Sequence, residues 1–198
     1  MYTLNARLPS RVPSHLSPPG ARMYGGITGS LAGLALLAGV TGLVLLLALV
    51  LPAVRRAVEG QIAGQGRALL VLAWIVATAS SGGSLYFSEV VGFIPCILCW
   101  YQRIAMYPLV LVLGVGALTG DRRVWRYALP LSGTGLIIAL YHVALQLQPA
   151  LDVGMCTAGA PCNVRYVAVF GFVSIPVMAA GGFLLISGLV LAAARAAD

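Results

Sequence analysis

The sequence is poor in charge and contains no lysine. Only 9% of its 198 residues are charged and only five of them are acidic, whereas 60% are hydrophobic. Soluble domains carry about 25% charged residues, so too few charges are available here to cover a surface of that kind. The composition therefore argues against a soluble domain.

The basic residues are 12 arginines, which give a formal net charge of +7. They stand singly or in twos and threes between long apolar runs. Nucleic-acid-binding proteins instead gather basic residues on one polar face, with aromatic residues among them. We therefore expect no nucleic-acid partner. The length suits one domain, and 24 glycines are compatible with membrane helices, in which small residues let backbones approach closely.

Five apolar stretches are long enough, or nearly so, to cross a bilayer as helices. A spanning helix needs about 20 apolar residues, because it rises ~1.5 Å per residue and satisfies its backbone polar groups internally. We predict an all-α integral membrane protein with spans at 27–51, 68–87, 98–118, 128–147 and 168–191. Residues 1–26 have no apolar period, which predicts a disordered tail, and 193–198 form a C-terminal tail.

The first predicted span, 27–51, is a retained helix rather than a cleaved signal peptide. Its apolar run exceeds the usual signal-peptide core of about 7–15 residues, and no clear small-x-small cleavage site follows it. Gly25, Gly29 and Gly33 repeat at intervals of four within or just before this span. They either form a close-packing face or reflect only the frequency of glycine in membrane helices.

Arginines near the ends of spans indicate which side faces the cytoplasm. They gather in the connection 52–67, in the connection between the third and fourth spans, and after the fifth span: Arg55, Arg56, Arg67, Arg122, Arg123, Arg126 and Arg195. We therefore expect these segments in the cytoplasm and the connections 88–97 and 148–167 outside. The same orientation puts the N-terminal tail outside with Arg7, Arg11 and Arg22, against the rule.

All four cysteines fall in, or directly next to, the two connections assigned to the outside. Cys96 and Cys99 form a C-x-x-C motif, the first pair, and Cys156 and Cys162 form the second pair. Thiols outside the cytoplasmic membrane are not kept reduced by glutathione or thioredoxin, so each pair is expected to form a disulfide. Such bonds can be inert staples. A bond across so short a loop constrains the unfolded chain little, however, which favours a redox role for the first pair.

The position of Cys99 at the start of the third span also favours reactivity. In the first turn of a helix, the unpaired amides and the positive helix end stabilise a thiolate. Arg103 is one turn further along the same face, where its charge can stabilise that thiolate or hold a polar head group. The alternative is an arginine that only extends toward water at the membrane interface.

Metal and haem binding are the competing interpretations of four cysteines. Paired zinc ligands are usually separated by about two to four residues, but five separate Cys156 from Cys162, and both loops face an oxidising compartment. Trp100 stands where a c-type haem motif requires histidine. We therefore expect no metal, and no thioredoxin domain either, because no soluble βαβ pattern surrounds the motif.

An extended motif surrounds the first pair, from Tyr86 through Gly-Phe-Ile-Pro-Cys-Ile-Leu-Cys-Trp-Tyr-Gln-Arg to Met106-Tyr107-Pro108-Leu109. Further residues follow in a consistent order: Tyr141-His142, Gln146, Cys156, Pro161-Cys162, Gly171-Phe172 and Ile175-Pro176. Together they resemble the disulfide bond formation protein B family (DsbB), particularly its BdbC-type branch. The resemblance extends from the second predicted span through the fifth.

This resemblance implies a DsbB-like four-helix bundle at 68–192, preceded by one additional transmembrane helix, in the bacterial cytoplasmic membrane. It implies a quinone-dependent oxidoreductase that reoxidises an extracytoplasmic thioredoxin-like thiol oxidase, similar to DsbA or BdbD. The electrons would pass to a membrane quinone, either menaquinone or ubiquinone. The activity would support disulfide formation in secreted proteins.

The resemblance also implies roles for single residues. All four cysteines would be catalytic: Cys96 and Cys99 next to the quinone, with the Cys99 sulfur nearest its ring, and Cys156 and Cys162 meeting the partner protein. Arg103 matches an arginine that contacts the quinone. His142 lies in a stretch like one beside the quinone site, unless it is simply a satisfied buried histidine.

Two departures from the family are the additional first helix and the short sequence between the cysteines of the second pair. Two other classes of function also compete with the enzyme. One is a non-catalytic membrane scaffold with structural disulfides. The other is a metal-binding or transport protein, which the lack of intramembrane acidic residues and of a histidine and methionine array argues against.

Overall fold

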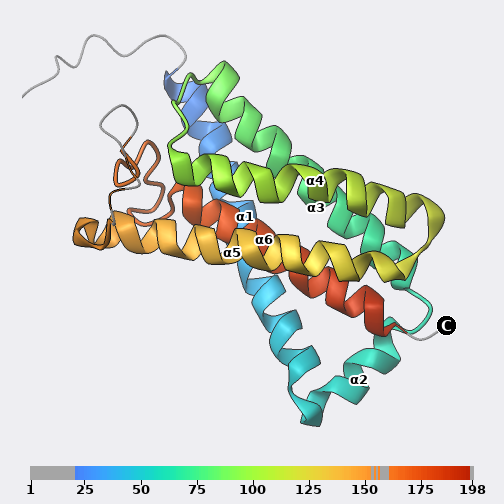
Figure 1. Ribbon diagram of the computed structural model, residues 1–198. Helices are drawn as coiled ribbons and strands as arrows, with labels where there is room; N and C mark the ends of the chain where they lie inside the picture. Colours follow the sequence, from blue (N-terminus) through green and yellow to red (C-terminus); the bar gives the residue numbers. More distant parts are fainter. Residues whose placement is uncertain (1–20, 153, 155, 157–160, 197–198) are drawn as a thin grey trace, which may run out of the picture.

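The structure is a computed structural model that describes residues 21–196 except 153, 155 and 157–160 (Figure 1). The described residues form six α-helices: α1 (Ala21–Val50), α2 (Pro52–Ile62), α3 (Gly66–Leu85), α4 (Ile97–Thr119), α5 (Trp125–Leu147) and α6 (Ile175–Arg195). Five of them, all except α2, are long and apolar enough to span a membrane. The prediction of an all-α membrane protein with five spans is therefore confirmed.

The helix boundaries differ most from the prediction at the fifth span. We predicted a span from residue 168, but α6 begins at Ile175. Before it, Val169 and Val173 form an antiparallel bridge around Phe170 and Gly171, whose φ angles of 53° and 80° are left-handed and reverse the chain. Pro176 then occupies the first turn of α6, where its missing N–H costs no helical hydrogen bond.

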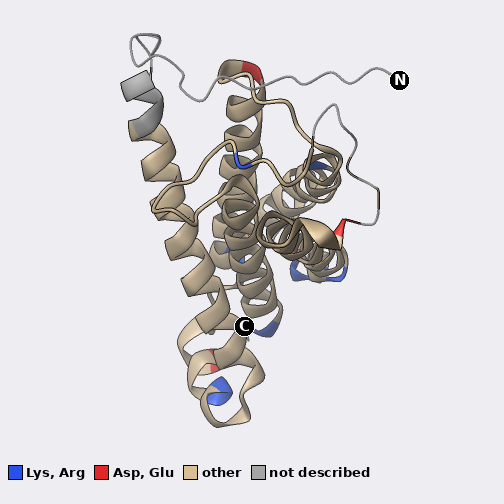
Figure 2. Cartoon of the chain, turned by 90° about the vertical axis from the view of Figure 1, so that its left-hand side faces the viewer, with Lys and Arg blue, Asp and Glu red and all other residues tan. Residues whose placement is uncertain are grey.

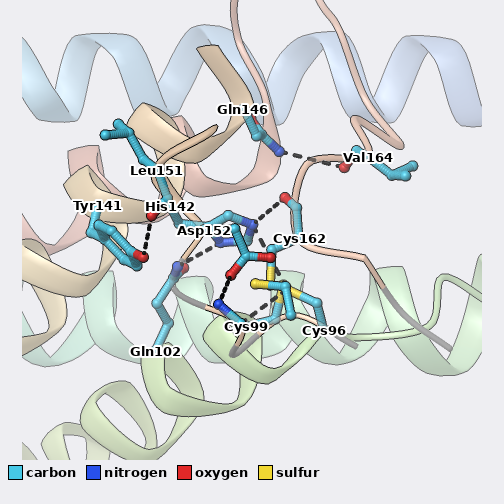
Figure 3. Close-up of a disulfide and its surroundings, with 12 residues drawn as sticks. Cys96, Cys99, Gln102, Tyr141, His142, Gln146, Leu151, Asp152, Cys162 and Val164 are labelled. Carbon is cyan, nitrogen blue, oxygen red and sulfur yellow. Dashed lines mark hydrogen bonds between the residues drawn. A yellow bond between two sulfur atoms is a disulfide. The ribbon is translucent and has the colours of Figure 1, made fainter. Parts of the chain in front are cut away.

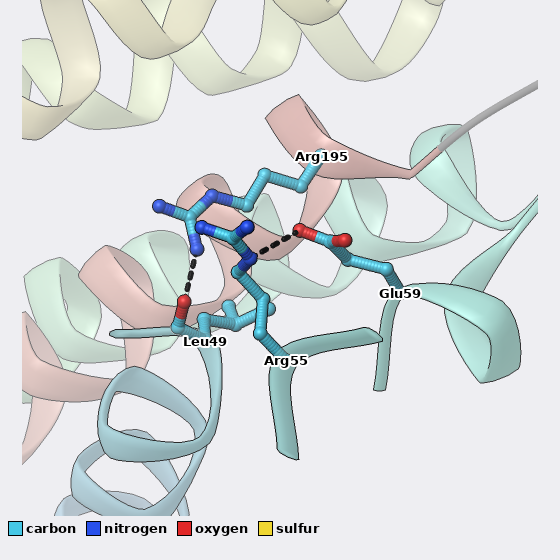
Figure 4. Close-up of polar contacts among 4 residues, drawn as sticks. All are labelled: Leu49, Arg55, Glu59 and Arg195. Atoms are coloured by element: carbon cyan, nitrogen blue, oxygen red, sulfur yellow. Dashed lines mark hydrogen bonds and ion pairs between the residues drawn. The ribbon is translucent and has the colours of Figure 1, made fainter. Parts of the chain in front are cut away.

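The predicted connection 52–67 contains a helix of its own. Pro52 starts α2, which has no buried residue, and Arg55 pairs with Glu59 one turn later at 3.6 Å (Figure 4). Close by, Arg195 at the end of α6 donates a hydrogen bond to the Leu49 carbonyl oxygen of α1. The ends of α1 and α6 are therefore joined on this side of the molecule.

α1 packs in parallel against α6 through glycines. A Cβ atom on Gly39 would lie 3.3 Å from the Gly181 Cα, and one on Gly42 would lie 2.5 Å from the backbone of Leu184. The space beside Gly29 and Gly33 is open, so of the two alternatives the close-packing face does not form at these residues. The glycines that allow close approach lie two turns further along α1, where α6 also carries glycine.

The core lies between α3, α4, α5 and α6. Its largest fully buried side chain, Phe183 of α6, occupies the space that a side chain at Gly135 of α5 would need. The only buried polar pair between α5 and α6 that the described residues form joins Ser187 Oγ to Ser132 Oγ at 2.9 Å. Charged residues are few and stand mostly near helix ends (Figure 2). The bundle is therefore held by close apolar packing.

We predict that Gly42→Val weakens the packing of α1 on α6, because the new side chain meets backbone atoms that cannot rotate away. Overpacking of this kind costs about 1–3 kcal/mol. Thermal unfolding of the detergent-solubilised protein should show a lower midpoint for Gly42→Val, whereas Gly33→Val, beside open space, should leave it unchanged. Equal midpoints for the two variants would contradict this packing.

Candidate functional site

The first cysteine pair sits at the N-terminus of α4. Cys96 is the N-cap residue, and its sulfur accepts a hydrogen bond from the Cys99 amide at 3.4 Å. The two sulfur atoms are 3.1 Å apart and both cysteines are free thiols, so the pair that we predicted as a disulfide is reduced in this structure. Cys96 is buried and Cys99 is half-buried.

Negative charge is best stabilised on Cys96. The pKa of its thiol is lowered from 9.0 to about 4, chiefly by the hydrogen bond from the Cys99 side chain. Hydrogen bonds from His142 and from the Cys99 amide also lower this pKa, while burial opposes them. We expected the thiolate at Cys99 from its place in the first turn, but the donors in this arrangement point to the N-cap sulfur.

His142 of α5 is buried between the two cysteine pairs (Figure 3). Its Nε2 atom is 3.0 Å from the Cys162 carbonyl oxygen and 3.7 Å from the Cys96 sulfur, and its Nδ1 atom is 3.1 Å from Gln102 Nε2. A carbonyl oxygen only accepts and an amide NH2 only donates, so these partners assign the proton of neutral His142 to Nε2. That N–H faces both the Cys162 carbonyl and the Cys96 sulfur.

Cys156 and Cys162 form a disulfide, as the sequence predicts for the second pair. Cys162 is only 2% exposed and packs in one cluster with Cys96, Leu98 and Leu145, whereas Cys156 is half-buried. One sulfur of the second pair therefore faces the first pair, and the other is the more accessible from outside the bundle.

The end of α5 holds the segment that carries the second pair. Tyr141 Oη donates to the Leu151 carbonyl at 3.1 Å, and Gln146 Nε2 donates to the Val164 carbonyl at 3.5 Å. With the bond from His142, all three polar residues of the Tyr-His-x-x-x-Gln stretch bind backbone of this segment (Figure 3). These contacts position the disulfide against the first pair.

Two cavities meet at Cys99. The large cavity has a volume of about 520 Å³, and Gln102, Arg103 and Ser84 line it beside Cys99. The small cavity, of about 20 Å³, is lined by Cys99 together with Cys96, His142 and Cys162 among others. Cys99 thus stands between the second pair and the large cavity. His142 lines only the small one of these two cavities.

Arg103 brings a positive charge to the wall of the large cavity. Its Nε atom donates to Ser84 Oγ and its Nη2 atom to the Ser84 carbonyl, both at 3.0 Å, and its guanidinium lies 5.1 Å from the Trp100 ring centroid. No carboxylate within the described part of the chain pairs with it. Ser84 therefore fixes the orientation of a cation that still has donors for an oxygen-bearing ligand.

Aromatic rings close the cysteine end of the large cavity. The ring centroids of Phe87 and Phe93 are 5.9 Å apart, and those of Phe93 and Tyr166 are 4.9 Å apart, with both pairs stacked. All three residues line the cavity. They come from the turn that follows α3, the loop before α4 and the segment after the second pair, so aromatic rings cover this end of the site.

The sequence did not identify two residues that orient the candidate site residues. Gln102 orients the His142 ring by a hydrogen bond. The sequence indicates it only as a polar residue within an apolar span, three positions after Cys99. Ser84 orients Arg103, but it is one of several serines in the second half of α3, and nothing in the sequence distinguishes it. Both acquire their roles from a partner on another helix.

The donor atoms of Cys96, Cys99 and His142 lie within 4.8 Å of one another, which is close enough to hold a metal ion. A metal would require the lone pair of the nearest imidazole nitrogen. Here that nitrogen, Nε2, carries the proton that bonds the Cys162 carbonyl. The arrangement therefore favours thiol chemistry at this cluster.

Comparisons with known proteins agree with this chemistry. Residues 66–194 match the family model described as disulfide bond formation protein DsbB. Disulfide bond formation protein C of Bacillus subtilis is 48% identical over 118 residues, which cover 59% of this chain and 86% of that protein. Probable disulfide formation protein C 2 of Bacillus cereus is 45% identical over 121 residues, covering 61% and 87%. No solved structure matches the chain.

We predict that the reduced first pair contains one thiolate down to low pH. A thiol is deprotonated above its pKa, so the ultraviolet absorbance of the thiolate should persist from neutral pH and disappear only as the pH falls to about 4. His142→Asn should move this transition to higher pH, because the imidazole N–H that faces the Cys96 sulfur is removed. The measurement uses protein with Cys156→Ser and Cys162→Ser, so that only the first pair titrates. A single transition near pH 9.0 would contradict the prediction.

Proposed function

The chain belongs to the DsbB family of disulfide bond formation proteins, and we propose that it oxidises a thioredoxin-like extracytoplasmic protein and reduces a membrane quinone. The net reaction moves two electrons and two protons from two partner thiols to the quinone. It yields a disulfide in the partner and a quinol. The observation that carries this proposal is the position of Cys99, which lines both the small cavity between the pairs and the large cavity.

The reaction begins at the second pair. A thiolate of the partner attacks Cys156, the more accessible sulfur, which breaks the Cys156–Cys162 bond and leaves Cys162 as a thiolate. The second partner thiolate then attacks the partner sulfur of this mixed disulfide and releases Cys156. The partner leaves as a disulfide, and the second pair holds the two electrons.

The electrons next pass to the first pair, which enters this step as a Cys96–Cys99 disulfide. The Cys162 thiolate attacks Cys96, with which it shares a buried cluster, and releases Cys99. Cys156 then attacks Cys162, which restores the second disulfide and releases Cys96. The product has a reduced first pair and an oxidised second pair, which is the combination of thiols and disulfide in this structure.

His142 assists this exchange through the proton on Nε2. The N–H lies between the Cys162 carbonyl and the Cys96 sulfur, so it can stabilise the charge that appears on Cys96 when the mixed disulfide breaks. Gln102 holds the ring in the required tautomer by donating to Nδ1. The family resemblance alone would place His142 beside the quinone ring. We propose instead that His142 acts on the cysteines.

Arg103 would hold the quinone in the large cavity. It offers a donor next to Cys99, Ser84 orients it, and no carboxylate within the described part of the chain competes for it. A quinone, when bound, supplies the acceptor for two electrons and two protons. Menaquinone and ubiquinone both present ring carbonyls to this donor, so the proposal includes either one.

The proposed orientation places the cysteine loops outside the bacterial cytoplasmic membrane. Arginines cluster on α2 and at the helix ends opposite the cysteines: Arg55, Arg56, Arg67, Arg122, Arg123, Arg126 and Arg195. Arginine-rich ends are retained in the cytoplasm. Since α1 runs parallel to α6, its beginning lies on the outer side with the cysteine loops.

The direct test uses purified full-length protein in detergent, a reduced thioredoxin-like oxidase and a soluble quinone. We expect loss of the quinone absorbance with wild-type protein and none above background with Cys99→Ser, because Cys99 is the sulfur next to the large cavity. An inert scaffold with structural disulfides would give no turnover. Absence of turnover by the wild type with both menaquinone and ubiquinone analogues would overturn the proposal.

Arg103→Met should raise the KM for quinone by roughly 10- to 100-fold, since a charge-assisted hydrogen bond is worth about 1.5–3 kcal/mol. Ser84→Ala should raise this KM by a smaller factor, because the cation remains but loses the hydroxyl that orients it. Ser81→Ala is the matched control, since the buried Ser81 hydroxyl has no hydrogen-bond partner among the residues that the structure describes. An unchanged KM in Arg103→Met would leave Arg103 as an interfacial anchor.

A further inference from the structure

The helix that lies outside the family match contributes to the large cavity. The match begins at residue 66, after α1 and α2. Nevertheless, six residues of α1 line the cavity that contains Cys99 and Arg103: Leu31, Leu34, Ala35, Leu37, Ala38 and Thr41. The remaining lining residues lie on α3, α4 and α6, on the segment between α3 and α4, and at Tyr166 before α6. The cavity is thus enclosed between the added helix and the bundle.

Close packing fixes this wall in place. Four of the lining positions, 31, 34, 35 and 38, follow the spacing of one helix face. Gly39 lies at the edge of this face, and Gly42 lies on it one turn beyond Ala38; both meet the backbone of α6. The face of α1 that lines the cavity is therefore packed against α6 at Ala35 and at its far end at Gly42, which holds this wall against the bundle.

The cavity has one polar end and a long apolar remainder. Along α6 its lining extends from Ile175 to Leu189, which at ~1.5 Å per residue is roughly 21 Å. Leu34 and Leu37 of α1 and Ile75 of α3 line it although they are 63%, 68% and 54% exposed. The cavity is therefore a groove that opens sideways toward lipid between α1 and α3.

These features suit a molecule with a small polar ring and a long apolar tail. Arg103 is the only charged residue among the described residues of the lining, and two of its three nitrogens already bind Ser84. The remaining donors suit a ring carbonyl better than a phosphate, which accepts several hydrogen bonds at once. A phospholipid is therefore the less suitable occupant.

We propose that α1 forms one wall of a groove that binds the isoprenoid tail of the quinone, an inference that rests on the proposed function. The ring would lie beside Cys99 and Arg103, and the tail would follow Ala35, Ala38 and Thr41. The added helix would then select long-chain membrane quinones and direct their rings toward the first pair.

The test compares a long-chain quinone with a short-chain analogue that has the same ring and a single isoprene unit. Ala38→Trp fills the groove, and Val40→Trp is the matched control, because Val40 is on the same helix, 63% exposed and not part of the lining. Ala38→Trp should raise the KM for the long-chain quinone by roughly three- to tenfold. This estimate is modest because a displaced tail still finds apolar lipid or detergent.

The KM and kcat for the short-chain analogue should stay unchanged in Val40→Trp, and in Ala38→Trp its KM should rise by a smaller factor than the KM for the long-chain quinone. Leu34→Trp provides a second test at an exposed lining position if Ala38→Trp lowers the thermal midpoint. Unchanged KM values for the long-chain quinone, with normal turnover of the short-chain analogue, would overturn the inference and leave the proposed function intact. Equal increases in the KM values for the long-chain and short-chain quinones would also overturn the inference, since the substitution would then disturb binding of the ring rather than of the tail. Absence of turnover in the wild type would instead refute the proposed function.

Discussion

The arrangement of the site depends on the buried hydrogen bonds of His142. A buried imidazole must satisfy both nitrogens, and here each nitrogen has a partner on a different segment: Gln102 on α4 and the Cys162 carbonyl beyond α5. These two bonds bring the second disulfide to the N-terminus of α4. They also leave the Nε2 proton beside the Cys96 sulfur. One side chain therefore holds the two cysteine pairs together and adds to the stabilisation of negative charge on Cys96, which the Cys99 side chain chiefly provides.

This preference has a consequence for the direction of electron flow. A dithiol whose thiolate is stabilised is a better oxidant in its disulfide form, because reduction is then more favourable. Cys96, with its lowered pKa, has this property, and Cys99 stands next to the cavity with Arg103. The chain of contacts from Cys156 to the large cavity thus agrees with transfer from the second pair to the first and then to a lipid-soluble acceptor.

Much of the fold and of the candidate site could be predicted from the sequence, because the length of apolar stretches and the spacing of cysteines are local features of the sequence. The five spans and the Cys156–Cys162 bond follow from them. The start of α6 could not be predicted, since residues 168–174 are apolar enough for a helix, and the reversal at Phe170 depends on pairing with Val173. The partnerships of Gln102 and Ser84 were also hidden, because each depends on which helices become neighbours. The contribution of α1 to the cavity is a further result of packing rather than of composition.

The proposed reaction depends on transfer of electrons from the second pair to the first. The most direct measurement mixes fully oxidised protein, without quinone, with one equivalent of reduced partner and then maps the thiols by alkylation and mass spectrometry. If this transfer occurs, Cys96 and Cys99 are alkylated and the Cys156–Cys162 disulfide stays intact. Alkylated Cys156 and Cys162 with an intact Cys96–Cys99 disulfide would contradict it, because the electrons would then have remained on the second pair.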